Sequence, residues 1–144
     1  MGAVSVRWGR DVFVVDTNVV SETTRPRPSP SVIGFLAAQP VVVLSVVSLM
    51  ELQAGVLLAP PVRRDRLARW LEALLTSGSV LLVPVDEPVA RAAAHLRATH
   101  RARRISTEDL FIGATALVRG EVLVTRNTRD FEVFGVPLLD PFTP

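Results

Sequence analysis

The sequence predicts a three-layer α/β/α sandwich around a mostly parallel central sheet. Short apolar runs rich in β-branched residues alternate along the chain with helical patterns. Runs such as residues 12–15 have no polar face, which is typical of strands buried on both sides in a parallel sheet. With 144 residues, the chain is long enough for a substantial core. We therefore expect one domain over residues 1–144, with residues 1–10 as a flexible N-terminus.

The same patterns place the elements in chain order. Three alternating prolines in residues 25–30 disfavour a helix and predict an extended connector. Asp86 is a plausible helix cap with Pro88 in the first turn, and Gly120 is expected to end the last long helix. The expected strands are 12–15, 41–44, 80–83, 122–124 and a short edge strand at 136–139. The expected helices are a short turn of helix after Asp16, then 31–38, 46–58, 62–75, 86–99 and 110–118.

The helix at residues 46–58 is apolar at almost every position. Its exceptions Ser48, Glu51 and Gly55 fall on one face. We expect this helix to be largely buried, with its polar stripe facing something polar. An ion pair between Glu51 and a structural arginine is the alternative for this acid.

Composition excludes several classes of protein. The chain has no cysteine, so it has no disulfide framework, thiol nucleophile or cysteine-based zinc site. Its longest apolar run, residues 41–50, is too short for a membrane span of about 20 residues. We expect a cytoplasmic protein with no membrane partner. His95 and His100 belong to no catalytic or metal motif, so we interpret both as surface residues.

All 16 basic residues are arginine, and the net charge is +2. Eight of them gather in two groups of four, at residues 63–69 and 97–104. Each group is either a solvated helix face or a patch that contacts phosphates.

Four acids occupy comparable positions in the expected topology. Asp16 follows the first strand, and Glu51 lies in the helix after the second strand. Asp109 lies in the first turn of the last long helix, and Asp130 follows the fourth strand after a turn. In a parallel sheet with right-handed crossovers these positions converge on one edge. Carboxylates that share a site repel one another, and a hard cation such as Mg²⁺ or Mn²⁺ resolves that conflict.

Structural explanations exist for two of these acids. Asp16 is a possible helix cap, and Ser106 with Asp109 resembles a capping box. Against this, Gly113 and Ala116 lie one and two turns beyond Asp109 on its face of the helix. We expect these small residues to leave room for an ion and a substrate backbone.

Four segments in order resemble the four motifs of PIN-domain ribonucleases, and most closely those of the toxin subunits of VapBC-type toxin–antitoxin pairs. The segments are residues 16–22, 48–55, 109–116 and 125–131. The resemblance implies a metal-dependent endoribonuclease with a cognate antitoxin, and a homodimer. It also implies that the acids hold one or two Mg²⁺ or Mn²⁺ ions, which generate a hydroxide nucleophile and stabilise charge on the leaving oxygen.

The resemblance carries over to particular residues. Family members place the fourth acid at the position of Asn127 or of Asp130, and because Asn127 is neutral here, Asp130 is the candidate. The implied catalytic and metal-binding residues are Asp16, Glu51, Asp109 and Asp130. The residues implied to orient these ligands or a bound water are Asn18, Ser48 and Asn127. The residues expected to surround the acidic site and contact RNA phosphates are Arg101, Arg103 and Arg104.

Two other functions remain open at this point. One is a catalytically silent PIN-like module that acts only through protein contacts. The other is a phosphate-handling α/β domain with Asp16 as the phosphorylated nucleophile, although such domains rely on a lysine that this chain lacks. For self-association and antitoxin binding we expect apolar residues on the outer helices, namely Val32, Phe35, Leu67, Trp70 and Leu71.

Overall fold

The computed structural model describes residues 12–144, and within them five parallel strands form one sheet in the order β3-β2-β1-β4-β5. The expectation for residues 1–10 lies outside the described residues. The strands are β1 (Phe13–Val15), β2 (Val42–Ser45), β3 (Val80–Val83), β4 (Val122–Val124) and β5 (Leu138–Leu139). The predicted strand positions are confirmed, and β5 lies at a sheet edge as expected, although it begins two residues later.

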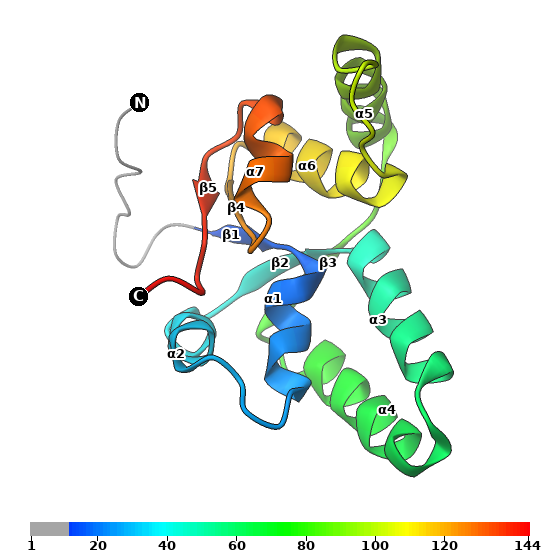
Figure 1. Cartoon of the computed structure of the whole chain (residues 1–144), viewed down its shortest axis with the longest axis vertical. Helices are drawn as coiled ribbons and strands as arrows, with labels where there is room; N and C mark the ends of the chain where they lie inside the picture. The colour runs from blue at the N-terminus through cyan, green and yellow to red at the C-terminus, as the bar shows by residue number, and fades with distance from the viewer. Residues whose placement is uncertain (1–11) are drawn as a thin grey trace.

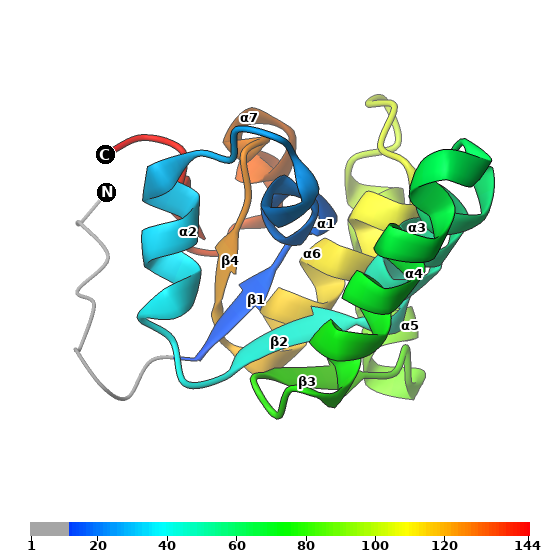
Figure 2. The ribbon, with the colours of Figure 1, turned by 90° about the horizontal axis from the view of Figure 1, so that it is seen from below.

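Helices connect the strands and cover both faces of the sheet (Figures 1 and 2). They are α1 (Thr17–Ser21), η1 (Glu22–Thr24), α2 (Pro30–Ala37), α3 (Val46–Leu58), α4 (Pro61–Thr76), α5 (Glu87–Thr99), α6 (Thr107–Arg119), α7 (Thr128–Phe131) and η2 (Glu132–Phe134). Caps explain several boundaries. The Ser106 hydroxyl accepts the Asp109 N–H at the start of α6, and Gly120 ends that helix in the left-handed conformation.

Side chains of alternate residues in the strands point into two separate hydrophobic cores. Val14 and Val43 point into a core that includes buried residues of α5, α6 and η2. Val15 and Leu44 point into a second core that includes buried residues of α1, α2, α3 and α4. This alternation is the period of two that a β-strand imposes. The predicted α/β/α layering is therefore confirmed.

The helix α3 differs from its prediction. Ser48 is fully buried, whereas Met50, Leu57 and Leu58 have exposed fractions of 54%, 63% and 85%. Because α3 and α4 pack as an antiparallel pair that extends past the sheet, the outer side of α3 has no layer above it (Figures 1 and 2). The expectation of a largely buried helix was wrong.

The apolar residues chosen for an outer interface are also placed differently. Val32 and Leu71 are buried in the core beneath α2 and α4. Phe35, Leu67 and Trp70 are partly buried and pack against the same core. Val32 and Leu71 are therefore not available to an interface, whereas Phe35, Leu67 and Trp70 keep part of their surface exposed. None of the helices in residues 12–144 has the length and apolar character needed to cross a membrane.

Candidate active site

Asp16 lies directly after β1, at the carboxyl edge of the sheet, and is only 5% exposed. Its Oδ1 accepts the Thr17 N–H at 2.7 Å, and its Oδ2 accepts the Thr125 hydroxyl at 2.8 Å. The Asn18 side-chain amide donates to the same Oδ2 at 3.3 Å. Burial raises the pKa of Asp16, and the Thr125 hydrogen bond opposes that shift. Asp16 is thus both the cap of α1 and a buried acid at the carboxyl edge of the sheet.

Glu51 comes to the same edge from the second turn of α3. The Thr17 hydroxyl, which lies 2.9 Å from the Ser48 hydroxyl, donates to Glu51 Oε1 at 2.7 Å. Burial raises the pKa of Glu51, Thr17 opposes the shift, and the charges of Asp16 and Glu108 add to it. In residues 12–144 no arginine lies within ion-pair distance of Glu51, so the structural ion pair is not formed there.

Asp109 lies in the first turn of α6 and is half-buried. Burial and then the charge of Asp16 raise its pKa from 3.8 to about 6. This value of about 6 also includes smaller upward contributions from the charges of Asp130 and Glu51 and a downward one from the Ser106 hydroxyl. The capping role belongs to Ser106, which leaves the Asp109 carboxylate available to the other acids. Carboxylates from four separate segments therefore act on one another electrostatically, as convergence at one sheet edge requires.

Asn127 and Asp130 are both exposed on the segment after β4. Asn127 precedes α7, and its backbone N–H donates to the Thr125 hydroxyl at 3.0 Å. Asp130 is the third residue of α7, and its charge contributes to the raised pKa of Asp109. Of these two residues only Asp130 is charged, and its charge acts on Asp109.

The chemistry of these donors fits a hard divalent cation. The converging groups are carboxylate, hydroxyl and amide oxygens, which are the donors that Mg²⁺ and Mn²⁺ prefer. Burial is the main cause of the raised pKa values of Asp16, Glu51 and Asp109, and neighbouring carboxylates add to it at Glu51 and Asp109, so a cation bound among them would oppose these shifts. As they stand, no three Asp, Glu or His side chains of residues 12–144 form a group tight enough to hold an ion.

The small residues beyond Asp109 have a packing role. A Cβ atom at Gly113 would overlap the Phe134 ring, so this glycine makes room for an aromatic side chain of η2. Ala116 is fully buried in the same helix. The expectation that these residues leave space for an ion and a substrate was wrong, because core packing already fills that space.

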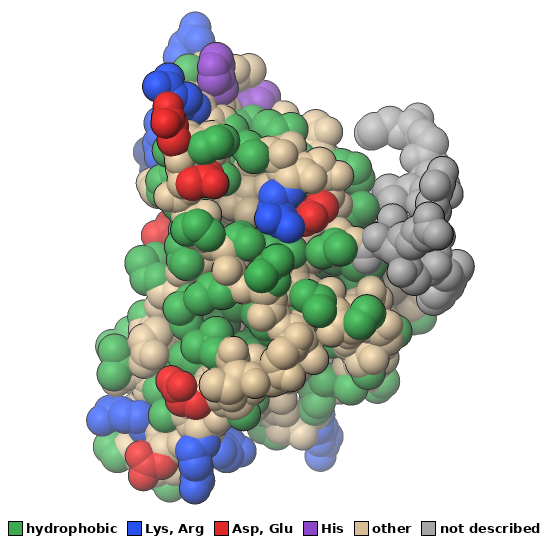
Figure 3. Space-filling view, turned by 180° about the vertical axis from the view of Figure 1, so that it is seen from behind, with side chains coloured by type: hydrophobic (Ala, Val, Ile, Leu, Met, Phe, Trp, Pro, Cys, Tyr) green, Lys and Arg blue, Asp and Glu red, His purple; other side chains and the backbone are tan. Residues whose placement is uncertain are grey.

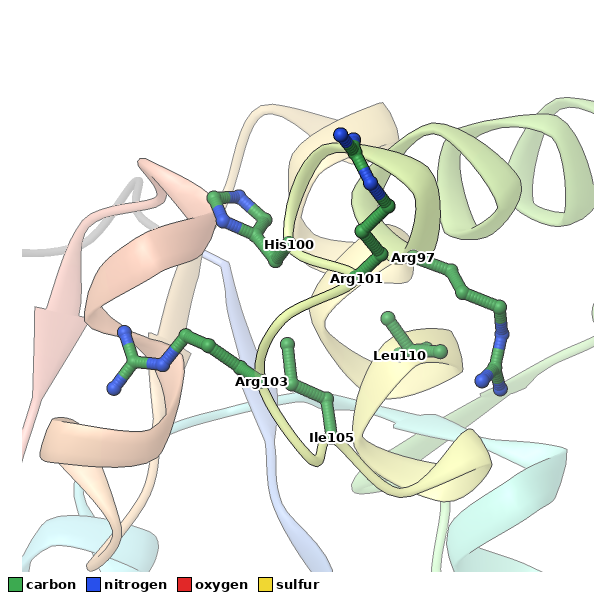
Figure 4. Close-up of a pocket in the computed structure, with 6 residues that line it drawn as sticks. All are labelled: Arg97, His100, Arg101, Arg103, Ile105 and Leu110. Carbon is green, nitrogen blue, oxygen red and sulfur yellow. The ribbon is translucent and has the colours of Figure 1, made fainter.

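The second arginine group lies around the loop between α5 and α6 (Figure 4). Arg101 and Arg103 line a pocket there, and Arg104 is exposed on the same loop. His95 is exposed as expected, and His100 is a half-buried residue of the pocket wall with its ring 6.4 Å from that of Phe134. Because α6 begins directly after this loop, the arginines and Asp109 belong to one continuous stretch of chain.

The sequence of the chain matches a known protein family. The model of the PIN domain matches residues 13–136, which include every acid described above. The chain belongs to the PIN domain family. The four segments that resemble PIN motifs all lie in the matched part.

The chain is similar to three known proteins over almost their whole length. The chain is 35% identical over 91% of its length to plasmid stability protein StbB of Pseudomonas syringae pv. tomato, covering 99% of it. It is 31% identical over 92% of its length to VapC ribonuclease Y4jK of Sinorhizobium fredii, covering 99% of it. Toxin FitB of Neisseria gonorrhoeae is 33% identical over 91% of this chain and 99% of its own length.

The fold also matches a solved structure. The crystal structure of FitAcB from Neisseria gonorrhoeae superposes with a TM-score of 0.79 at 33% identity, covering 92% of this chain and 99% of that chain. The sheet and its helices therefore form the PIN fold.

Three residues of the site received no role from the sequence alone. Thr17 and Thr125 each donate a hydroxyl hydrogen bond to one of the acids, and Glu108 raises the pKa of Glu51. Thr125 directly follows β4, and Thr17 is the first residue of α1, one position beyond Asp16. A hydroxyl within two residues of the end of a buried parallel strand is the signal that could have identified both, because these positions open onto the same sheet edge.

Proposed function

We propose that this PIN domain is a Mg²⁺- or Mn²⁺-dependent endoribonuclease that hydrolyses phosphodiester bonds of cytoplasmic RNA, and that it is the toxin of a toxin–antitoxin pair. One observation carries the proposal: Asp16, Glu51 and Asp109 meet at one edge of the sheet with raised pKa values and no basic partner in residues 12–144. Support also comes from relatives that are named as a ribonuclease and a toxin.

The side chains around the acids define how such a site would work. Thr125 and Asn18 hold the Asp16 carboxylate in one orientation, and Thr17 holds that of Glu51. Fixed carboxylates need less reorganisation when a ligand arrives. A divalent cation held by Asp16, Glu51, Asp109 and Asp130 would supply the Lewis acidity that phosphodiester hydrolysis needs.

An RNA cleavage assay tests this proposal. Purified protein should cleave single-stranded RNA with Mg²⁺ or Mn²⁺ and lose that activity in EDTA. Asp16→Asn and Asp109→Asn should each lower the rate by at least about a hundredfold, as expected when charged groups that stabilise a transition state are removed. Asp65→Asn, at an exposed position on α4, is the matched control and should cleave at the wild-type rate. Wild-type rates in either site variant, with the fold intact by circular dichroism, would overturn the proposal.

The identity of the fourth acid has its own test. We assign it to Asp130, because its charge acts on Asp109. Asp130→Asn should weaken Mn²⁺ binding measured by calorimetry, whereas Asn127→Ala should leave Mn²⁺ affinity nearly unchanged and affect only the cleavage rate. The reverse order of effects would move the assignment to Asn127.

For partners, we propose a cognate antitoxin and a second copy of the chain. Exposed apolar side chains support this, since they are costly on an isolated monomer. Figure 3 shows hydrophobic side chains spread across one face, with most of the arginine side chains toward its two ends and a few charged side chains among the hydrophobic ones. The most exposed large apolar residues are Met50, Leu57, Leu58 and Val62 in the α3–α4 pair, and Leu81, Leu117 and Val118.

Light scattering after size-exclusion chromatography tests the association. The wild-type chain should be larger than a monomer, either alone or with the product of a neighbouring short reading frame. Leu57→Asn combined with Leu58→Asn should weaken at least one of these complexes. A wild-type monomer at high concentration that also ignores the neighbouring product would contradict both partners.

A further inference from the structure

A pocket of about 260 Å³ lies between the end of α5, the loop at 100–105 and the first turn of α6 (Figure 4). Its lining residues are Arg97, His100, Arg101, Arg103, Ile105 and Leu110. The volume is slightly below the roughly 300–1,000 Å³ of pockets that take drug-sized molecules. The pocket therefore has room for one group of about the size of a nucleotide.

The pocket is positively charged and contains no acid. None of its three arginines forms an ion pair with any residue in 12–144. Their recorded partners are neutral: Arg97 donates to the Thr107 hydroxyl at 3.0 Å, and Arg101 donates to the Ala98 carbonyl at 3.3 Å. The three guanidinium groups are exposed and point in different directions (Figure 4), and because none pairs with a carboxylate of residues 12–144, each is free to bind an anionic group such as a phosphate.

The pocket also has an apolar part. In Figure 4 the Ile105 and Leu110 side chains lie between those of Arg97 and Arg103. Leu110 is buried and Ile105 is half-buried, while the half-buried His100 ring packs beside Phe134. A simple phosphate site needs no such surface. Arginines beside an apolar and aromatic surface are the combination with which proteins hold a nucleotide of a single strand, its phosphate by charge and its base by contact.

The pocket shares the first turn of α6 with the acidic site. Leu110 is the neighbour of Asp109, and Arg97 is hydrogen-bonded to Thr107 in the same turn. We propose that this pocket binds one nucleotide of a single-stranded RNA substrate beside the cleaved bond, and so contributes to the choice of cleavage position. This inference rests on the proposed ribonuclease function. It goes beyond phosphate contacts by loop arginines, because it assigns a base-binding site and adds Arg97, His100 and Ile105.

Binding can be measured without cleavage by fluorescence anisotropy of a labelled 2′-O-methyl oligoribonucleotide in EDTA. Arg101→Ala with Arg103→Ala should weaken binding and reduce the slope of log affinity against log salt by about 0.7, the contribution of the one phosphate that the bound nucleotide brings to a single-strand complex. The matched control is Arg63→Ala with Arg66→Ala, which removes the same charge from exposed positions on α4. Equal effects of the two double variants would show a general charge effect and overturn the inference.

A second variant tests whether the pocket contacts the base of the nucleotide. Ile105→Ala removes apolar contact and should weaken binding of the base-bearing oligomer about fivefold. It should leave the affinity for an abasic oligomer of the same charge unchanged. The mapped cleavage positions on a mixed-sequence RNA should also shift. Equal losses for both oligomers, or unchanged cleavage positions, would exclude a base site.

The nucleotide pocket and the ribonuclease function can be disproved separately. If the pocket variants bind and cleave like wild type while Asp16→Asn is inactive, the pocket inference is wrong and the ribonuclease function stands. If no RNA is cleaved at all, the ribonuclease function is wrong. In that case the anisotropy measurements still decide whether the pocket binds a nucleotide.

Discussion

Replacing Asp109 by asparagine should stabilise the metal-free protein, and the effect should depend on pH. Burial and the neighbouring acids raise the pKa of Asp109 from 3.8 to about 6. The folded state therefore holds this proton more tightly than the unfolded chain does. The stability contributed by the protonated acid is complete below about pH 4 and is lost as pH rises through about 6.

The size of the effect follows from the two pKa values. Their difference corresponds to at most about 3 kcal/mol of unfolding free energy. Because Asp109 is half-exposed, solvent screening reduces this to about 1–2 kcal/mol. Asparagine keeps the shape of the side chain and removes the charge. In EDTA, Asp109→Asn should thus be about 1–2 kcal/mol more stable than wild type at about pH 8, and the advantage should shrink toward about pH 4.

Urea unfolding at the two pH values measures this difference. Ser29→Ala is the control, because it removes a cap bond on α2, to the Val32 N–H, that does not touch Asp109, and it should cost about 1 kcal/mol at both pH values. Added Mg²⁺ should stabilise wild type more than the variant, since a ligand stabilises only the state that binds it. If metal-free Asp109→Asn is less stable than wild type at about pH 8, the carboxylate has a structural role and the reasoning fails.

Two further predictions concern the side chains around the site. Thr125→Val removes the 2.8 Å bond to buried Asp16 and should destabilise the protein by about 1.5–3 kcal/mol in urea unfolding, with Thr125→Ser restoring most of the loss. Gly113→Ala should destabilise by about 1–3 kcal/mol, because its Cβ would overlap Phe134. Gly55→Ala, where a Cβ meets open space in α3, should instead stabilise by up to about 1 kcal/mol, and equal effects at the two glycines would contradict the packing explanation.

The sequence predicted the sheet well because its strands carry an unambiguous signal. The run ending at Val15 has apolar residues on both faces, and the structure buries all three residues of β1. Once such strands are parallel, their carboxyl ends must share one edge. That topology brought Asp16 and Asp109 together although 93 positions separate them in the chain.

Other features could not be obtained from pattern alone. The apolar residues Leu57 and Leu58 look like core residues, but the pattern does not show that α3 extends past the sheet. Gly113 beside an acid suggested an open site, whereas a distant aromatic residue, Phe134, fills that space. Such outcomes depend on contacts between segments far apart in the chain. Helical periodicity records which residues share a face and not what covers that face.

We propose that the carboxylates of Asp16, Glu51, Asp109 and Asp130, which come from separate segments, hold a divalent cation at the carboxyl edge of the sheet. Mn²⁺ titration followed by electron paramagnetic resonance tests it most directly, because it counts bound ions without requiring a substrate. We predict saturable binding of one or two Mn²⁺ ions to wild type, loss of that binding in Asp16→Asn, and wild-type binding in the Asp65→Asn control. Saturable binding that survives in Asp16→Asn, or no saturable binding to wild type, would contradict the account.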